Sequence, residues 1–126
     1  MNPKSETPDR DPRSLLPLTP LAYQVLLALA DGARHGYGII REVDERTDGL
    51  IKLRTGTLYT MLQRLLDEQL LEETDERPAA PDDDARRKYY RMTTFGRDVL
   101  AAETRRLELV LGEARRKQVL NRTTRA

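Results

Sequence analysis

The sequence predicts a mainly α-helical fold with one small β-hairpin and a long helix after the hairpin. Three observations indicate this fold class. Apolar residues recur at helical spacing in several segments, two short stretches rich in β-forming residues follow the third of these, and the last helical pattern is the longest. Because 38% of the 126 residues are hydrophobic, the chain can bury one modest core, and we expect one domain.

The composition argues against several classes of protein. Lys and Arg number 22 against 21 Asp and Glu, so the net charge of +1 gives no overall basic signal, and any DNA-binding charge must be local. The chain has no Cys and one His, so we expect no disulfide, no metal site and no cofactor. Apolar runs are shorter than the roughly 18 to 20 residues that span a membrane, so we expect a cytoplasmic protein with no membrane partner.

Residues 1–17 are expected to form a flexible N-terminal arm, because this segment is rich in Pro and charge and has little to bury. Its apolar end, around Pro17, can lie along a neighbouring surface. The first helix is expected to begin at Thr19 and Pro20, since a Thr oxygen can cap free amides and Pro fits the first turn. This helix is largely apolar and ends at Gly32, so it belongs to the core.

A second helix is expected over 36–47, and His35 is expected to cap or pack at its start. Its expected inward positions are Tyr37, Ile40 and Val43. A turn then leads into an apolar run, residues 50–53, which is expected to form one brief strand. Helices joined by tight connections suggest helix-turn-helix packing.

The helix expected from Thr55 to Glu68 is the most informative stretch. Its apolar side chains recur at the spacing of one helix face and must be buried. They are Leu58, Met61, Leu62, Leu65 and Leu66. The opposite face is small, polar and lightly charged at its start, and comprises Gly56, Thr60, Gln63, Arg64 and Asp67. Thr55 can cap the first turn, and Gly56 leaves that end open to phosphate. This surface suits a DNA groove, and an ordinary solvated face is the alternative.

Two short strands are expected over 70–74 and 87–93, joined by a long polar loop. Alternation along the second strand predicts an apolar face towards the domain and a basic face towards solvent. The apolar face holds Tyr90 and Met92, and the basic face holds Arg87, Tyr89 and Arg91. A dense cationic patch is made of Arg86, Arg87 and Lys88. A solubilising edge strand is the alternative reading of this patch.

A long helix is expected over 94–117, capped by Thr93 or Thr94. It carries an apolar stripe with spacing near a heptad, and a second copy of the chain is the expected partner for this stripe. The expected dimerisation residues are Leu100, Leu107, Val110, Leu111 and Ala114. A helix that folds back onto its own domain is the alternative. Residues 118–126 are expected to form a basic, frayed tail.

This element order is that of a winged helix-turn-helix over residues 18–93, followed by a C-terminal dimerisation helix. In such proteins the third helix enters the major groove of DNA, and the hairpin, called the wing, contacts the adjacent backbone. The cationic patch would attract phosphates without reading sequence. Gln63 and Arg64 can read base edges, since an amide pairs with adenine and a guanidinium with guanine. Thr57 and Thr60 can contact phosphates or a thymine methyl.

The chain also resembles the PadR family of bacterial transcriptional regulators. The resembling segments are, in order, LTPLAYQVLLAL, HGYGIIREV, TGTLYTMLQRLLDEQLLEE and RRKYYRMTTFGRDVL. The resemblance covers about Leu18 to Leu111 and implies a homodimeric repressor, with a single C-terminal helix as in the short subgroup of the family. It also implies that Tyr37 and Tyr59 lie near the DNA backbone. The expected DNA-binding residues are therefore Tyr37, Thr55, Gly56, Thr57, Tyr59, Thr60, Gln63, Arg64, Arg86, Arg87 and Lys88.

We therefore expect a homodimeric repressor that binds double-stranded DNA at an inverted repeat. The chain shows no catalytic constellation, so we expect no enzymatic activity. A winged-helix protein-interaction module without its own operator is the alternative, favoured by the near-neutral charge and by acids in the wing loop. Those acids, Glu76 and Asp82 to Asp84, predict that the wing tip points away from DNA or is mobile. A small hydrophobic or aromatic effector is a further candidate partner, and it would bind between the C-terminal helix and the partner's first helix.

Overall fold

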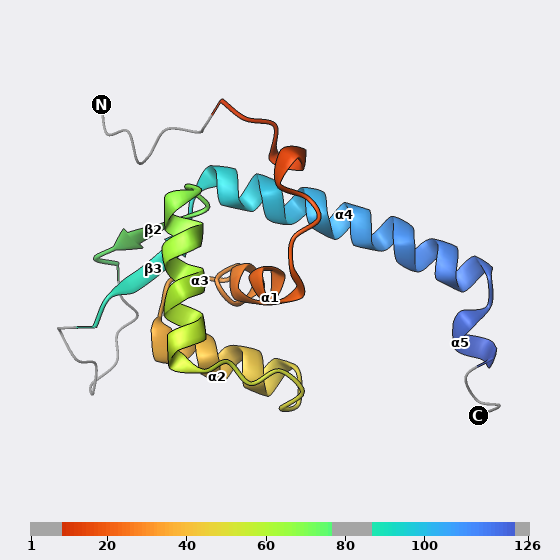
Figure 1. Ribbon diagram of the computed structural model, residues 1–126, viewed down its shortest axis with the longest axis horizontal. Coiled ribbons are helices and arrows are strands. Elements are labelled where there is room, and N and C mark those ends of the chain that lie inside the picture. The colour runs from red at the N-terminus through yellow and green to blue at the C-terminus, as the bar shows by residue number, and fades with distance from the viewer. Residues whose placement is uncertain (1–8, 77–86, 123–126) are drawn as a thin grey trace.

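A computed structural model describes residues 9–76 and 87–122 of the chain. Its helices are η2 (Pro12–Leu15), α1 (Pro20–Ala28), α2 (Gly36–Arg46), α3 (Thr55–Asp67), α4 (Thr94–Arg116) and α5 (Val119–Arg122). The strands β1 (Arg34–His35), β2 (Leu71–Thr74) and β3 (Tyr89–Met92) form an antiparallel sheet in the order β1-β3-β2. Helices α1, α2 and α3 pack together beside this sheet, and α4 crosses α1 (Figure 1). The predicted fold class is confirmed.

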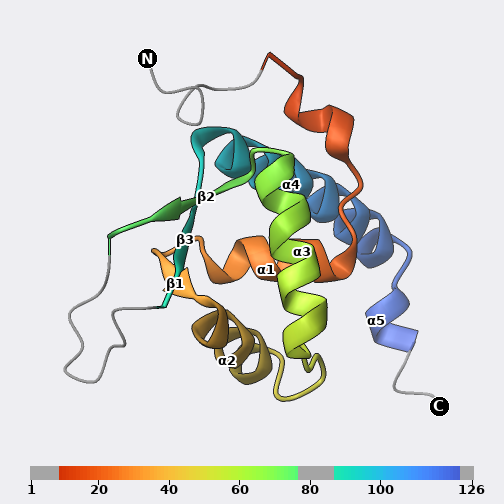
Figure 2. The ribbon, with the colours of Figure 1, turned by 60° about the vertical axis from the view of Figure 1, so that its left-hand side comes forward.

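The helical core follows the predicted periodicity. Thr19 caps α1 by accepting a hydrogen bond from the Ala22 amide at 3.1 Å, as predicted. The inward face of α3 is also as predicted: Leu58, Leu62 and Leu65 are buried, and Met61 and Leu66 pack partly buried against the same core. Figure 2 shows α3 lying across α1, with the sheet to one side, so its opposite face is turned outward.

The predicted inward face of α2 is wrong at Tyr37. This side chain is 59% exposed, and the buried residues of α2 are Gly36, Ile39 and Val43. The reason is the close approach of α3. A Cβ on Gly36 would lie 2.6 Å from the Tyr59 hydroxyl, so the face turned towards α3 must begin with a glycine.

The strand predicted over 50–53 is also wrong, because this segment forms a bend and an extended connection. Asp48 and Gly49 take positive φ values of 51° and 77°, which turn the chain directly towards α3. Leu50 is left 86% exposed. The third strand is β1, a two-residue segment that pairs with β3 and was not predicted.

Strand β3 lies at the centre of the sheet, and this changes the surroundings of Tyr89. The prediction placed Tyr89 on the solvent face, but it is 3% exposed. Its pairing partner across β1 is His35, whose ring meets the tyrosine ring edge-on with the centroids 5.2 Å apart. Tyr90 and Met92 are buried as predicted. Arg91 faces solvent and forms ion pairs with Glu72 of β2 and with Glu76, which follows β2.

The end of α3 is joined tightly to the start of α4. Helix α3 stops in a Schellman arrangement, in which the Leu70 amide donates to the Leu65 carbonyl at 2.9 Å and Gln69 takes a φ of +65°. Thr93, the N-cap of α4, donates its amide to the Leu70 carbonyl and its hydroxyl to the Gln69 carbonyl. Gly96 lies against the same Leu70 carbonyl, and a Cβ there would be 2.1 Å from that oxygen.

The first half of α4 is anchored by a buried carboxylate. Glu103 is 1% exposed, and its side chain accepts hydrogen bonds from the Leu18 amide at 2.8 Å and from Arg106. The Arg106 guanidinium lowers the pKa of Glu103, and the Leu18 amide acts in the same direction, although burial opposes both. Tyr23 of α1 adds a hydrogen bond to Thr104 at 2.8 Å.

Part of the predicted N-terminal arm is packed structure. Residues 12–15 form η2, which is capped by Asp11 and lies against α4. Leu15 and Leu16 are partly buried against the core. The neighbouring surface on which this apolar stretch lies is therefore the core of its own domain. At the other end of the chain, Val119–Arg122 of the predicted frayed tail form the short helix α5.

Replacing Gly96 by Ala should strongly destabilise the fold. The added methyl would collide with the backbone carbonyl of Leu70, which cannot move without disturbing both α3 and α4. We expect a loss of about 3 kcal/mol in the free energy of unfolding, measured by urea denaturation. Gly112→Ala is the control on the same helix, because a Cβ there meets no described atom within 4 Å. This control should gain roughly 0.5 to 1 kcal/mol, and equal effects of the two changes would contradict the packing described.

Glu103→Gln should destabilise the protein in a pH-dependent way. Because the folded-state pKa of Glu103 lies below its ordinary value of 4.5, the carboxylate contributes full stability above pH 4.5 and loses it as pH falls through the folded pKa. We expect the variant to be less stable by about 1 kcal/mol at pH 7. Urea denaturation of both proteins between pH 3 and pH 7 measures the difference. A difference that stayed constant down to pH 3 would contradict the assignment.

Candidate nucleic-acid interface

The outward face of α3 gathers the side chains predicted to contact DNA. Tyr59, Thr60, Gln63 and Arg64 are exposed and line one shallow surface depression, together with Asp67 and Glu68. Thr55, Gly56 and Thr57 are exposed at the start of the helix. The buried leucines on the other side of α3 hold this polar face towards solvent, so the predicted residues of α3 form one continuous surface.

The start of α3 differs from the prediction in one respect. Thr55 is the first helical residue, and the N-cap is Arg54, which makes no capping hydrogen bond with its side chain. The prediction of Thr55 as the cap is wrong because the helix begins one residue earlier than the capping pattern indicated. The first-turn amides thus lack the expected side-chain acceptor. A Cβ at Gly56 would meet no described atom within 4 Å, so the helix end is open to an external acceptor.

The family resemblance implies that two tyrosines lie near the DNA backbone. Tyr37 lies in the first turn of α2, and Tyr59 of α3 packs against the start of α2. Tyr59 is 49% exposed and rests its hydroxyl on Gly36, while Tyr37 projects from the first turn of α2. The Arg41 guanidinium lies 6.0 Å from the centroid of the Tyr37 ring. Burial raises the pKa of the neighbouring Tyr90, and Tyr59 adds to this rise. Both tyrosines are exposed and belong to helices, Tyr37 to α2 and Tyr59 to α3.

The cationic patch of the wing is only partly described. Arg86 lies outside the described residues, as do Asp82 to Asp84 of the acidic loop. Arg87 Nη1 lies 3.1 Å from His35 Nε2, and Lys88 pairs with Glu73 at 3.6 Å. His35 itself caps α2, because its Nδ1 accepts a hydrogen bond from the Gly38 amide at 3.0 Å, as predicted. This histidine therefore links the wing to the start of α2.

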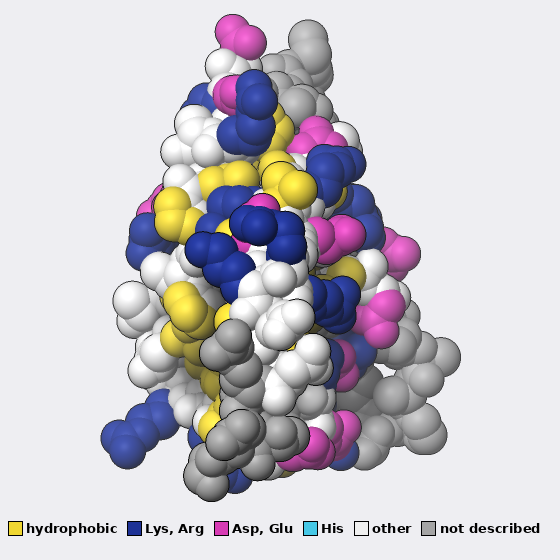
Figure 3. Space-filling view, turned by 90° about the vertical axis from the view of Figure 1, so that its right-hand side faces the viewer, with side chains coloured by type: hydrophobic (Ala, Val, Ile, Leu, Met, Phe, Trp, Pro, Cys, Tyr) yellow, Lys and Arg dark blue, Asp and Glu magenta, His cyan; other side chains and the backbone are white. Residues whose placement is uncertain are grey.

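The predicted dimerisation residues divide into two groups. Leu100 is buried against the domain itself, together with Val99 and Glu103 on the same stripe. Further along α4, Leu107, Val110 and Leu111 are 38%, 54% and 43% exposed, and Ala114 is partly buried. Figure 3 faces this end of the molecule and shows hydrophobic side chains interspersed with Lys and Arg. The alternative of a helix folded back on its own domain thus describes the first half of α4, and its second half keeps an uncovered apolar stripe.

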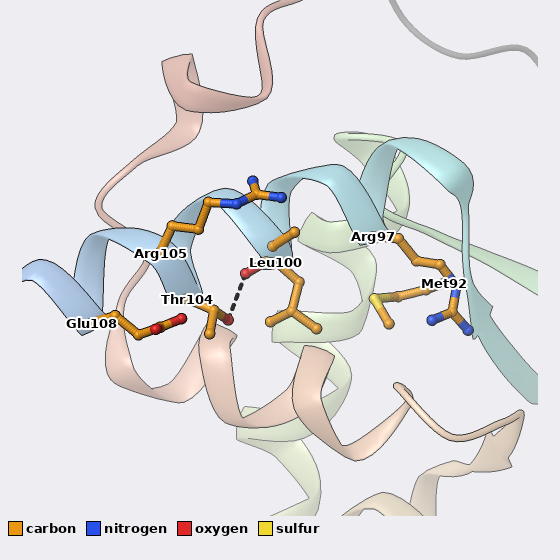
Figure 4. Close-up of a pocket in the computed structure, with 7 residues that line it drawn as sticks. Met92, Arg97, Leu100, Thr104, Arg105 and Glu108 are labelled. Carbon is orange, nitrogen blue, oxygen red and sulfur yellow. Dashed lines mark hydrogen bonds between the residues drawn. The ribbon is translucent and has the colours of Figure 1, made fainter.

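A second depression, of about 330 Å³, lies beside this stripe on α4 (Figure 4). Met92, Leu100 and Ala101 contribute its apolar surface, and Thr104 donates a hydrogen bond to the Leu100 carbonyl within it. Two arginines and one glutamate complete the lining, namely Arg97, Arg105 and Glu108. Because this lining carries both signs of charge, its chemistry selects no single class of ligand. The described residues contain no group of acids and His placed to hold a metal ion.

A helix-turn-helix whose third helix exposes a polar face beside a β-hairpin defines a winged-helix protein. The model of the transcriptional regulator PadR-like family matches residues 25–102. The chain therefore belongs to this family, which makes it a DNA-binding transcriptional regulator and not an enzyme. In the part of the chain that the structure describes, we find no helix that could span a membrane.

Solved structures are similar to this chain over most of its length. One is a complex structure of RosR from H. salinarum, hsRosR-S4, which shares 28% sequence identity with this chain. The match covers 90% of this chain and 94% of the RosR chain, with a TM-score of 0.63. A PadR family transcription regulator from Clostridium difficile shares 23% identity over 78% of this chain and 97% of its own, with a TM-score of 0.65. Bacillus subtilis PadR, solved in complex with operator DNA, shares 23% identity over 65% of this chain and 45% of its own, with a TM-score of 0.53. Because the last two structures share less than 25% identity with this chain, they show a similarity of fold alone.

Proposed function

We propose that the protein is a homodimeric repressor that binds an inverted-repeat operator, with α3 in the major groove and the wing on the backbone. The observation that carries this proposal is the outward face of α3, where four exposed side chains predicted to contact DNA line one depression. The operator-DNA complex of Bacillus subtilis PadR supports DNA as the partner. Such a repressor would act in the cytoplasm, with residues 18–93 as its DNA-binding domain and 94–117 as its dimerisation helix.

The proposed contacts fall into two kinds. Gln63 and Arg64 would read base edges, because they stand in the middle of the exposed face of α3 and present an amide and a guanidinium. The remaining residues would bind phosphates and position the helix without reading sequence, except that Thr57 and Thr60 can contact a thymine methyl instead. They are Tyr37, Thr55, Gly56, Thr57, Tyr59 and Thr60 on the helices and Arg86, Arg87 and Lys88 in the wing.

The proposed dimer forms through the exposed second half of α4. Leu107, Val110 and Leu111 continue the stripe that Leu100 begins, at the three- and four-residue spacing that lets two helices pack together. Exposed apolar rows of this kind are costly in water, and a second copy of the chain would bury both rows at once. An inverted repeat follows from this arrangement, since a two-fold dimer presents two identical α3 helices.

Arg64→Ala should weaken specific DNA binding. The change removes a side chain that can pair bidentately with guanine, so we expect a loss of about 1 to 3 kcal/mol for the target duplex and a smaller loss for unrelated DNA. Fluorescence anisotropy with duplexes from the region upstream of its own coding sequence measures both affinities. Arg115→Ala removes the same charge from an exposed position on α4 and should have little effect. The absence of any salt-sensitive binding by the wild type would favour an interaction module without its own operator.

Leu107→Glu should convert the proposed dimer into a monomer. The charge would be buried in the seam between two α4 helices, which is costly in free energy. Light scattering should then give a mass near the 14.5 kDa of one chain, against twice that mass for the wild type. Leu109→Glu is the matched control, because Leu109 is 74% exposed and lies off the stripe. A dimeric Leu107→Glu variant would count against the seam.

A further inference from the structure

Each of the two side chains proposed to read bases is held by an acidic residue four positions further along the chain, at the C-terminal end of α3. Gln63 Nε2 donates to Asp67 Oδ1 at 2.9 Å, and Arg64 Nε donates to Glu68 Oε1 at 3.1 Å. All four side chains line the depression on the outer face of the helix. The acids are therefore part of the same surface as the proposed readers.

The geometry of these two hydrogen bonds leaves the base-reading edges available. In Gln63 the carboxylate takes one N–H, so the amide oxygen and the second N–H remain as the acceptor and donor that match adenine. In Arg64 the carboxylate takes the Nε edge, so the two terminal nitrogens remain for the paired acceptors of guanine. An ionised carboxylate can only accept hydrogen bonds, so Asp67 must bind the nitrogen of the Gln63 amide and not its oxygen.

These pairs are poorly arranged for stabilising the helix. An Arg four residues before a Glu is the weaker order for a helical ion pair. Both carboxylates lie at the C-terminal end of α3, where negative charge opposes the helix dipole. The Arg64 side chain is also 65% exposed, so solvent screens its pair with Glu68. Stability alone would favour neutral or basic residues at these positions.

The backbone of Glu68 is held in place by hydrogen bonds at both its amide and its carbonyl. The Glu68 amide donates to the Arg64 carbonyl at 3.0 Å, and the Glu68 carbonyl accepts a hydrogen bond from Arg10 at 2.5 Å. The Arg10 guanidinium in turn lies 4.8 Å from the centroid of the Phe95 ring at the start of α4. The end of α3 that carries the acid is thus held by the N-terminal segment and by α4.

We propose that Asp67 and Glu68 are positioning residues that set sequence specificity by orienting Gln63 and Arg64 for adenine and guanine. This inference rests on the proposed function. The carboxylates hold each reader ready for a base, and their negative charge penalises the close approach of phosphate that non-specific binding needs. They therefore raise the ratio of specific to non-specific affinity and lower non-specific affinity itself.

The test compares two affinities for a set of variants. The probes are the duplex that the wild type protects in a footprint of its upstream region and a scrambled duplex of the same composition, both followed by fluorescence anisotropy at fixed salt. Glu68→Ala and Asp67→Ala should each lower the specific-to-non-specific ratio at least about fivefold. Glu68→Gln keeps a neutral acceptor for Arg64 and should retain part of the ratio. Thermal denaturation should show every variant at least as stable as the wild type, since an acid is removed from a helix C-terminus.

Glu45→Gln is the matched control, because Glu45 pairs with Arg41 in the same i, i+4 order on α2 at 3.4 Å. It removes one negative charge away from the readers and should leave the ratio unchanged. A ratio that stays constant in Glu68→Ala and Asp67→Ala, or shifts only as much as in the control, would overturn the inference while leaving the proposed function intact. A wild type that binds both duplexes equally would overturn the proposed function and the inference with it.

Discussion

The structure depends on the close contact between the Leu70 carbonyl and Gly96. Helix α3 ends in a left-handed residue, Gln69, and the chain then runs directly under the first turn of α4. Thr93 closes this junction by bonding to both carbonyls of the turn and by capping α4 through the Gly96 amide. The end of the helix that exposes the polar face and the start of the helix that carries the apolar stripe are thereby in direct hydrogen-bonded contact. In a dimer built through α4, this junction would fix the separation of the two α3 helices.

The stripe on α4 has a buried half and an exposed half that its sequence does not separate. The same heptad-like spacing runs from Val99 to Ala114, but its first half covers the core of its own domain. The division comes from partners far away in the chain: the Leu18 amide reaches Glu103, and η2 lies on the same helix. Periodicity reports that a face is apolar, and it carries no information on which neighbour covers it. The exposed second half is the part still available to another subunit.

Local patterns predicted most of the fold, and long-range contacts explain where they failed. The caps at Thr19 and Thr93, the buried face of α3 and the hairpin all follow from nearby residues. Strand β1 could not be predicted, because two residues have no periodicity and pair only when β3 lies beside them. The burial of Tyr89 follows from that pairing. In the candidate interface, residue types and helical spacing predicted which side chains of α3 are exposed. The i, i+4 spacing indicates that Gln63 can pair with Asp67 and Arg64 with Glu68. The proposed role of these pairs follows only from the structure, which shows which hydrogen-bonding groups of Gln63 and Arg64 the carboxylates leave unused.

In the proposed dimer, the junction at Leu70 and Gly96 would hold α3 rigidly on α4, so the two α3 helices would have a fixed spacing. The most direct test is the affinity of the wild type for its operator before and after insertion of about five base pairs, half a helical turn, between the half-sites. A rigid dimer cannot reach both half-sites after this insertion and should bind at least about a hundredfold more weakly. An affinity that changed less than about twofold would show that the two reading helices move independently, which would contradict the rigid junction at Leu70 and Gly96.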